Sequence, residues 1–223
     1  MIEQMLFRYM YMMQEFSFQT GIEIKRIVLF LHGYGANGED LLSIGKHWQD
    51  SLPDTLFIAP NAPYPHPYIP NGFMWFDFKD VAQITSDDIK DGLNQIRPML
   101  QDYLKVLSKK YDVPLPKIVP VGFSQGAMIA LDLLVCEPEI EVVVDYAGIY
   151  YPMRTFIENA ALKRVLLVHG TDDTVVSYHH MPEAEKALTD LGIHVTPITC
   201  SGLGHSIDAE GISAGERFLK EAS

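Results

Sequence analysis

The sequence predicts an α/β fold with a mostly parallel central sheet and helices on both of its faces. Short apolar segments rich in Val, Ile and Leu alternate with segments of helix length, as expected when crossover helices connect parallel strands. Within the short segments apolar residues follow one another, which is typical of strands buried on both faces. A chain of 223 residues with 48% hydrophobic content can build one sizeable core, so we expect a single domain over 1–223.

The expected elements follow in chain order. Strand-like segments occupy 27–31, 55–59, 117–121, 142–147, 165–169 and 194–199. Helix-like segments occupy 39–51, 86–110, 125–137, 182–191 and 208–221. One segment, PNAPYPHPYIPNGFMWFDF at 60–78, interrupts the alternation and is dense in proline and aromatic residues. Because proline fixes φ and removes a donor, we expect a rigid, irregular excursion after a strand's carboxyl end, where open α/β sheets bind ligands.

The composition argues against several classes of partner. The net charge is −12, the pI is near 5.0, and no basic cluster is longer than a pair such as Lys109 and Lys110. We therefore expect no nucleic-acid partner. No apolar run approaches the ~20 residues of a membrane span, and the N-terminus lacks the layout of a signal peptide. We expect no transmembrane segment and a cytoplasmic location.

Sulfur-containing residues have structural interpretations. A group near the N-terminus is expected to belong to a core-covering helix or a first strand rather than to a contact surface, namely Met5, Met10, Met12 and Met13. Cys136 and Cys200 could form one disulfide, but the dense, regular cysteine spacing of small secreted domains is absent. We expect two buried free thiols.

The stretch IVLFLHGYGANGEDLL at 27–42 has two interpretations. Its GxGxxG at 33–38 is typical of a dinucleotide-binding turn. Its His32, Gly33 and Tyr34 after a strand are also typical of a loop that supplies half of an oxyanion hole. A dinucleotide site needs an acidic residue at the end of the next strand. That strand, 55–59, ends without one, and Asp54 lies at its other end. We therefore favour the oxyanion loop and expect no cofactor.

A second motif lies in VPVGFSQGAMIALDLL, where Gly122, Ser124 and Gly126 form GxSxG. An apolar strand ends at the first glycine and a helical pattern begins after the second, which is the context of a nucleophile elbow. The alternative is a helix N-cap serine with a glycine-lined entry.

A serine nucleophile needs a base and an acid, in the order Ser, Asp or Glu, His. After Ser124, a strand exit carries Asp172 and Asp173, and His205 follows in a glycine-rich loop. Asp145 is a rival acid near another strand end, for which a buried or rim position is the simpler interpretation. Three other histidines could compete with His205 for the role of base, but we interpret them as structural or solvated: His179, His180 and His194. No metal site is expected.

Together these segments resemble the phospholipase/carboxylesterase family, which includes the acyl-protein thioesterases. The matching stretches are LHGYGANGED, APNAP with WFDF, GFSQGA, HGTDDTVV and GLGH, between about residues 27 and 220. The resemblance implies an α/β-hydrolase fold, hydrolysis of carboxylic esters or thioesters, no cofactor and, as in many members, a homodimer. The first fifteen or so residues lie outside it.

The resemblance also implies roles by position. Ser124 corresponds to the nucleophile, Asp173 to the acid and His205 to the base, while the N–H groups of Tyr34 and Gln125 correspond to the oxyanion hole. The chain departs from the family at Ser177, where members often have proline. The expected mechanism is a Ser-His-Asp triad with an acyl-enzyme intermediate.

We expect the excursion at 60–78 to line the acyl side of the site, because apolar walls suit an acyl chain. The residues assigned to this wall are Tyr68, Phe73, Trp75 and Phe76. Alternatives are a dimer contact or a folded cap. The substrate class remains open between small esters, lysophospholipids and acylated proteins. The competing function classes are a non-catalytic protein and a dinucleotide-binding protein that uses 33–38.

Overall fold

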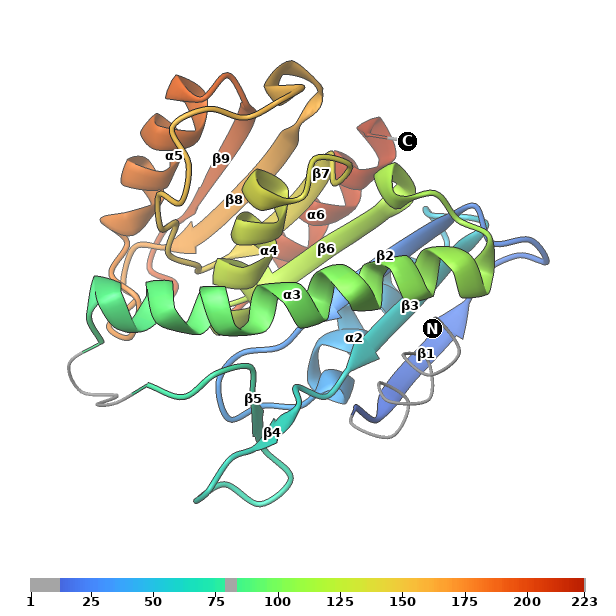
Figure 1. The fold of residues 1–223 in the computed structure, drawn as a ribbon, viewed down its shortest axis with the longest axis horizontal. Coiled ribbons are helices and arrows are strands. Elements are labelled where there is room, and N and C mark those ends of the chain that lie inside the picture. Colours follow the sequence, from blue (N-terminus) through green and yellow to red (C-terminus); the bar gives the residue numbers. More distant parts are fainter. Residues whose placement is uncertain (1–12, 79–83, 223) are drawn as a thin grey trace.

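The computed structural model describes residues 13–78 and 84–222, and its centre is a seven-stranded sheet (Figure 1). The strand order is β1-β3-β2-β6-β7-β8-β9. The strands are β1 Glu15–Gln19, β2 Arg26–Leu31, β3 Thr55–Pro60, β6 Ile118–Phe123, β7 Val142–Tyr146, β8 Arg164–Gly170 and β9 His194–Cys200.

All neighbouring strands from β3 to β9 pair in parallel, which confirms the predicted mostly parallel sheet. The exception is β1, an edge strand that pairs antiparallel with β3 and was not assigned from the sequence. Met13 precedes β1 and is buried in the core, in agreement with the expected structural role. The other three methionines of that group lie outside the described residues.

Helices cover both faces of the sheet. On one face lie α3 Ser86–Tyr111, α4 Gln125–Cys136 and α5 His180–Asp190; on the other lie α2 Gly38–Trp48 and α6 Ala209–Glu221 (Figure 1). Strand β2 contributes to both cores, since successive side chains point to opposite faces. Ile27, Leu29 and Leu31 pack on the α3 side, while Val28 and Phe30 pack on the α2 side.

The excursion at 60–78 folds back as a short hairpin of β4 Tyr64–Pro65 and β5 Phe73–Met74, which projects beyond the sheet (Figure 1). Phe73 also forms an isolated antiparallel bridge with Ala36 in the loop after β2. The excursion is therefore joined to the loop that follows β2.

Short 3-10 turns, η1 Leu115–Lys117 and η2 Ala160–Leu162, precede β6 and β8.

The strand order reverses at β2. The chain adds β3 on one side of β2 and then crosses through α3 to add β6 on the other side. In open α/β sheets the loops at such a reversal diverge and leave a crevice at the carboxyl ends of the strands. The loops after β2 and β6 meet at this point, and they carry the two glycine motifs.

A fully buried lysine holds the far end of α4. Lys163 Nζ donates to the carbonyl oxygens of Glu137 at 3.0 Å, Pro138 at 3.1 Å and Ile140 at 2.6 Å. Burial lowers the pKa of Lys163, although nearby acidic groups oppose the shift. These carbonyl groups belong to the turn that follows α4, and a cation there also interacts favourably with the negative end of the helix dipole.

We expect Lys163→Met to keep the volume but lower the free energy of unfolding by about 3 kcal/mol, because buried carbonyl oxygens lose charged donors. Urea unfolding at neutral pH measures the change. Lys186→Met, which removes an exposed lysine paired with Asp190, is the control and should cost less than about 1 kcal/mol. Equal stability of the two variants would contradict this role of Lys163.

Candidate active site

Ser124 occupies a strained turn between β6 and α4. Its φ of 54° and ψ of −116° lie outside the regions that non-glycine residues normally adopt. A Cβ atom at Gly122 would overlap the Gly126 carbonyl, and one at Gly126 would overlap the carbonyl oxygen of Leu31. The two glycines of GxSxG are therefore required by close backbone approach, as the nucleophile-elbow interpretation expects.

The loop after β2 lies beside this turn. A Cβ atom at Gly33 would be 3.4 Å from Ser124 Cβ. His32 is buried and bridges two main-chain groups: its Nε2 accepts from Ala62 N at 2.9 Å, and its Nδ1 therefore donates to Gly33 O at 2.8 Å. Burial lowers the pKa of His32 to about 4, so the ring is neutral at physiological pH. The loop that carries Tyr34 is thus fixed by a neutral histidine.

The end of β3 does not match the dinucleotide interpretation. Asn61 is buried there, and its Oδ1 accepts from Gly38 N at 2.9 Å. A Cβ atom at Gly38 would overlap the Ala59 carbonyl. The last glycine of the GxGxxG pattern therefore allows α2 to pack against β3.

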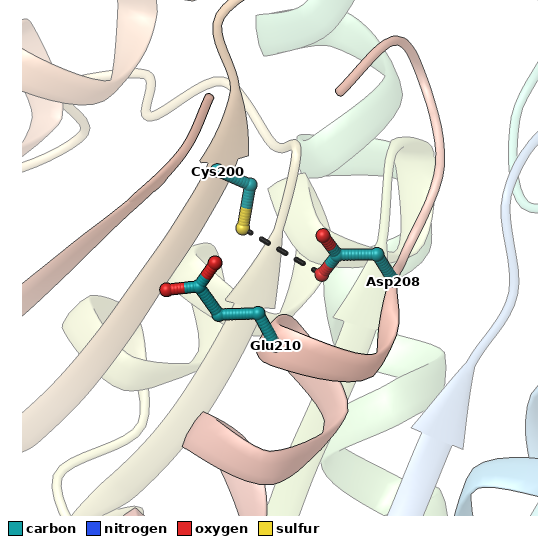
Figure 2. Close-up of side chains that lie close together, drawn as sticks. All are labelled: Cys200, Asp208 and Glu210. Atoms are coloured by element: carbon teal, nitrogen blue, oxygen red, sulfur yellow. Dashed lines mark hydrogen bonds between the residues drawn. The ribbon is translucent and has the colours of Figure 1, made fainter. Parts of the chain in front are cut away.

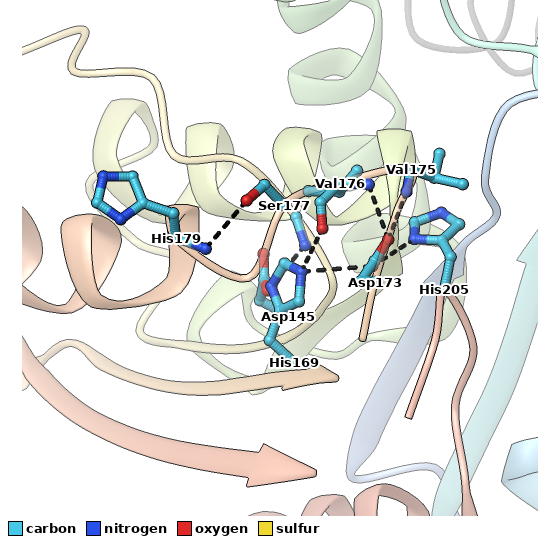
Figure 3. A network of polar contacts seen from close by, with 9 residues as sticks. Asp145, His169, Asp173, Val175, Val176, Ser177, His179 and His205 are labelled. Atoms are coloured by element: carbon cyan, nitrogen blue, oxygen red, sulfur yellow. Dashed lines mark hydrogen bonds and ion pairs between the residues drawn. The ribbon is translucent and has the colours of Figure 1, made fainter. Parts of the chain in front are cut away.

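Asp173 and His205 are joined directly, as Figure 3 shows. Asp173 Oδ2 accepts from His205 Nδ1 at 2.7 Å, and its Oδ1 accepts from the N–H groups of Val175 and Val176, each at 2.8 Å. Burial favours the neutral acid most strongly, but the hydrogen bonds from His205 and the two valines together outweigh it. They hold the pKa of Asp173 below its usual value, so this carboxylate is charged at neutral pH.

The neighbouring acids lie elsewhere. Asp172 is exposed, and its Oδ1 accepts from the Thr171 hydroxyl at 2.8 Å. Asp145 is buried in β7, where its Oδ1 accepts from Gly148 N at 3.2 Å and its Oδ2 has no hydrogen-bond partner among the described residues. Of the three acids considered from the sequence, Asp173 is the one placed against His205.

A second histidine lies behind the acid and was not identified from the sequence. His169, at the end of β8, is buried, and its Nε2 donates to Val176 O at 2.8 Å and lies 3.4 Å from Asp173 Oδ2 (Figure 3). Burial lowers the pKa of His169. Its position, four residues before Asp173, is the only sequence feature that could have indicated this contact.

Ser124 and His205 line one cavity of about 450 Å³. Tyr34 and Gln125 also line it, and the Gln125 N–H lies in the first turn of α4, where N–H groups lack acceptors within the helix. Within the described residues no hydrogen bond joins Ser124 Oγ to His205, an arrangement that is common in catalytic sites without substrate. His180, interpreted from the sequence as structural or solvated, lies on the cavity wall, with its Nδ1 3.3 Å from Glu183 Oε2.

The apolar wall of this cavity differs from the one expected. Among the described residues it is formed by Ala36, Phe78, Ile84, Phe123, Met128, Ile149, Val175 and Val176. The four residues assigned from the sequence do not line it: Trp75 and Phe76 are buried in the core, Phe73 is half-buried beside it, and Tyr68 is 89% exposed on the hairpin. The excursion thus reaches the cavity only at its end.

Both cysteines are free and buried, as expected. Among the described residues Cys200, Asp208 and Glu210 form the one group of three potential metal ligands close together (Figure 2). Burial, followed by the charges of Asp208 and Glu210, raises the pKa of the Cys200 thiol to about 11. Asp208 Oδ1 already accepts from Gly211 N at 2.8 Å as the N-cap of α6. This group is explained by helix capping.

Residues 19–223 match the model of the Phospholipase/Carboxylesterase family. The chain belongs to this family. Acyl-protein thioesterase 1 of Candida albicans is 28% identical over 220 residues, covering 90% of this chain and 94% of that protein. Esterase YpfH of Escherichia coli is 29% identical over 185 residues, covering 82% and 77%.

Solved structures agree with this membership. Esterase PE8 has a TM-score of 0.86 and 31% identity over 95% of this chain and 99% of that one. The Bacillus cereus carboxylesterase, at 20% identity, shares the fold with a TM-score of 0.79, covering 99% of this chain and all of that one. The family member described here therefore has the α/β-hydrolase fold and is an ester hydrolase. In its described part no helix combines the length and apolar character needed to cross a bilayer.

The buried acid Asp145 has a consequence for stability. Burial raises its pKa to about 7, against which the Gly148 N–H acts weakly. Since the folded protein then binds more protons than the unfolded chain between about pH 4 and 7, this residue makes stability fall as pH rises through that window. We compare the free energy of unfolding of Asp145→Asn with that of the natural enzyme at each pH. This difference should shift in favour of the variant by about 3 kcal/mol from pH 4.5 to pH 8. Urea unfolding at both pH values measures this, and a pH-independent difference would contradict it.

Proposed function

We propose that this enzyme hydrolyses acyl esters or thioesters through Ser124, His205 and Asp173. The observation that carries the proposal is the 2.7 Å hydrogen bond between Asp173 and His205 at the wall of the cavity that Ser124 also lines. Because His205 Nδ1 is bound to the acid, its Nε2 is the nitrogen available to the serine. This division of roles is the one that a serine nucleophile requires.

In the proposed reaction His205 takes the proton of the Ser124 hydroxyl while Oγ attacks the acyl carbon. The charged Asp173 orients the imidazole and stabilises its protonated form. The leaving alcohol or thiol departs with that proton, and a water molecule then repeats both steps on the acyl-enzyme, releasing the acid and the free serine.

The developing oxyanion is proposed to bind the N–H groups of Tyr34 and Gln125. Each such donor supplies roughly 3 to 4 kcal/mol of transition-state stabilisation. The Gln125 N–H is supported by its place at the start of α4, where the helix dipole also favours negative charge.

The cavity supports a substrate with one acyl chain. Its apolar wall, which includes Phe78, Met128 and Ile149, begins beside Ser124, and among the described residues the ionisable groups that line the cavity are Tyr34, His180 and His205. The named relatives include an acyl-protein thioesterase and an esterase, so both leaving-group types belong to the proposal. We also propose that the chain acts as one catalytic domain, because the site combines residues from the loop after β2 through to His205.

We expect Ser124→Ala to abolish hydrolysis of p-nitrophenyl esters and labelling by a fluorophosphonate. The thermal midpoint should stay nearly unchanged or rise, because activity rather than packing requires this strained residue. Assays of the natural enzyme and the variant with esters of increasing acyl length would test the proposal and rank the acyl chains by rate of hydrolysis. Labelling that persists in the variant would refute the assignment of the nucleophile.

The two adjacent acids provide a second test. We expect Asp173→Asn to lower kcat by at least ~10³-fold, because the imidazole loses the carboxylate that orients it. The matched variant Asp172→Asn should cost less than ~10-fold, since Asp172 is exposed and bonded to Thr171. Steady-state kinetics on one ester compare them, and the opposite ranking would identify Asp172 as the acid.

A further inference from the structure

The side chain of Gln125 is buried, and the oxygen and the nitrogen of its amide each form a hydrogen bond to one short run of main chain. Its Oε1 accepts from Trp75 N at 3.0 Å, and its Nε2 donates to Phe76 O at 2.8 Å. The same residue begins α4 directly after Ser124. Its amide therefore attaches the segment 73–78 to the serine turn.

The segment 73–78 is in turn attached to the loop after β2. Phe73 exchanges two main-chain hydrogen bonds with that loop, accepting from Gly35 N and donating to Ala36 O, each at 2.8 Å. The Trp75 indole N–H donates to His32 O at 2.9 Å.

A side-chain contact completes the attachment. The Tyr34 hydroxyl donates to Asp77 Oδ1 at 2.7 Å. Hydrogen bonds thus run without a break from the turn that carries Ser124, through 73–78, to the loop that carries Tyr34.

We propose that the Gln125 side chain is a positioning residue that holds the two halves of the oxyanion hole in register. This inference rests on the proposed function, in which Tyr34 N–H and Gln125 N–H bind one oxygen atom. The two donors follow different strands, Tyr34 in the loop after β2 and Gln125 at the start of α4 after β6. Their spacing depends on the backbone contact at Gly126 and on the hydrogen bonds that connect the two through 73–78. The Gln125 amide supplies that connection from the side of β6.

The required feature is the amide and not the main chain. Any residue other than proline at position 125 would offer its N–H to the site. Only a side chain with both a donor and an acceptor at this length satisfies Trp75 N and Phe76 O together. Both partners belong to buried residues. Without the amide, these two groups would remain unsatisfied, and the segment would shift to recover hydrogen bonds.

Gln125→Met tests this, because methionine has a similar length but cannot form either bond. We expect kcat to fall by about 10- to 100-fold with KM changed less than about 3-fold, since sub-ångström errors in donor placement act on the transition state. Affinity for a trifluoromethyl ketone, whose adduct places an oxyanion in the hole, should fall by the same factor as kcat/KM. The control is Gln101→Met on α3, which removes a hydrogen bond to Glu137 at the opposite end of α4 from Gln125 and should leave kinetics unchanged.

A double-mutant cycle separates positioning from general loosening. Tyr34→Phe removes the bond to Asp77, another link in the same connection. If both act on one connection, the double variant should lose clearly less than the product of the single losses. Circular dichroism checks whether Gln125→Met is folded. If it is not, Gln125→Glu, which keeps the acceptor for Trp75 N, replaces it in the cycle.

The outcomes are distinguishable. A folded Gln125→Met with kcat within 2-fold of the natural enzyme, or single losses that multiply, would overturn the inference while leaving the proposed function intact. If the natural enzyme shows no hydrolysis dependent on Ser124, the proposed function itself fails. The positioning role would be supported if Gln125→Met loses both ketone affinity and kcat, and if the double variant loses less than the product of the single losses.

Discussion

The site depends on the direct packing of the first turn of α4 against the end of β2. Gly126 touches the carbonyl groups of Leu31 and His32, and no side chain separates the two backbones. This approach brings Gly33 against Ser124 and places a strained residue at the carboxyl edge of the sheet. A β-carbon at Gly126 would push the helix away from β2 and separate the serine from the loop that carries Tyr34.

The charge state of each buried acid near the site follows from its number of donors. Asp173 receives two main-chain N–H groups and His205, and these hold its pKa low in spite of burial. Asp145 lies on β7, the strand next to β8, and among the described residues its carboxylate receives only the Gly148 N–H. Burial therefore raises its pKa to about 7. Two carboxyl groups of one chemical type therefore differ in pKa because of the local course of the main chain.

The sequence was sufficient for the parallel strands, and its motifs indicated that Asp173 would lie against His205 near Ser124, because continuous apolar runs and short motifs are local properties. It was not sufficient for β1, whose residues Glu15–Gln19 are half-exposed at an edge. Aromatic density at 60–78 indicated apolar contacts but not their direction, and Trp75 points into the core. The actual cavity wall joins residues from separate loops, a property of tertiary structure that no spacing along the chain encodes.

The position of β6 beside β2 has a consequence for the order of assembly. Ile27 pairs with Ile118, so about ninety residues must be synthesised before this apolar strand finds its second neighbour. Pairing across such a separation forms slowly and leaves an open edge during that interval. His205 follows the last strand, β9, so the histidine reaches Asp173 and the cavity that Ser124 lines only when the whole sheet is present. In refolding, recovered hydrolysis would therefore report completion of the sheet, whereas helical content would return earlier.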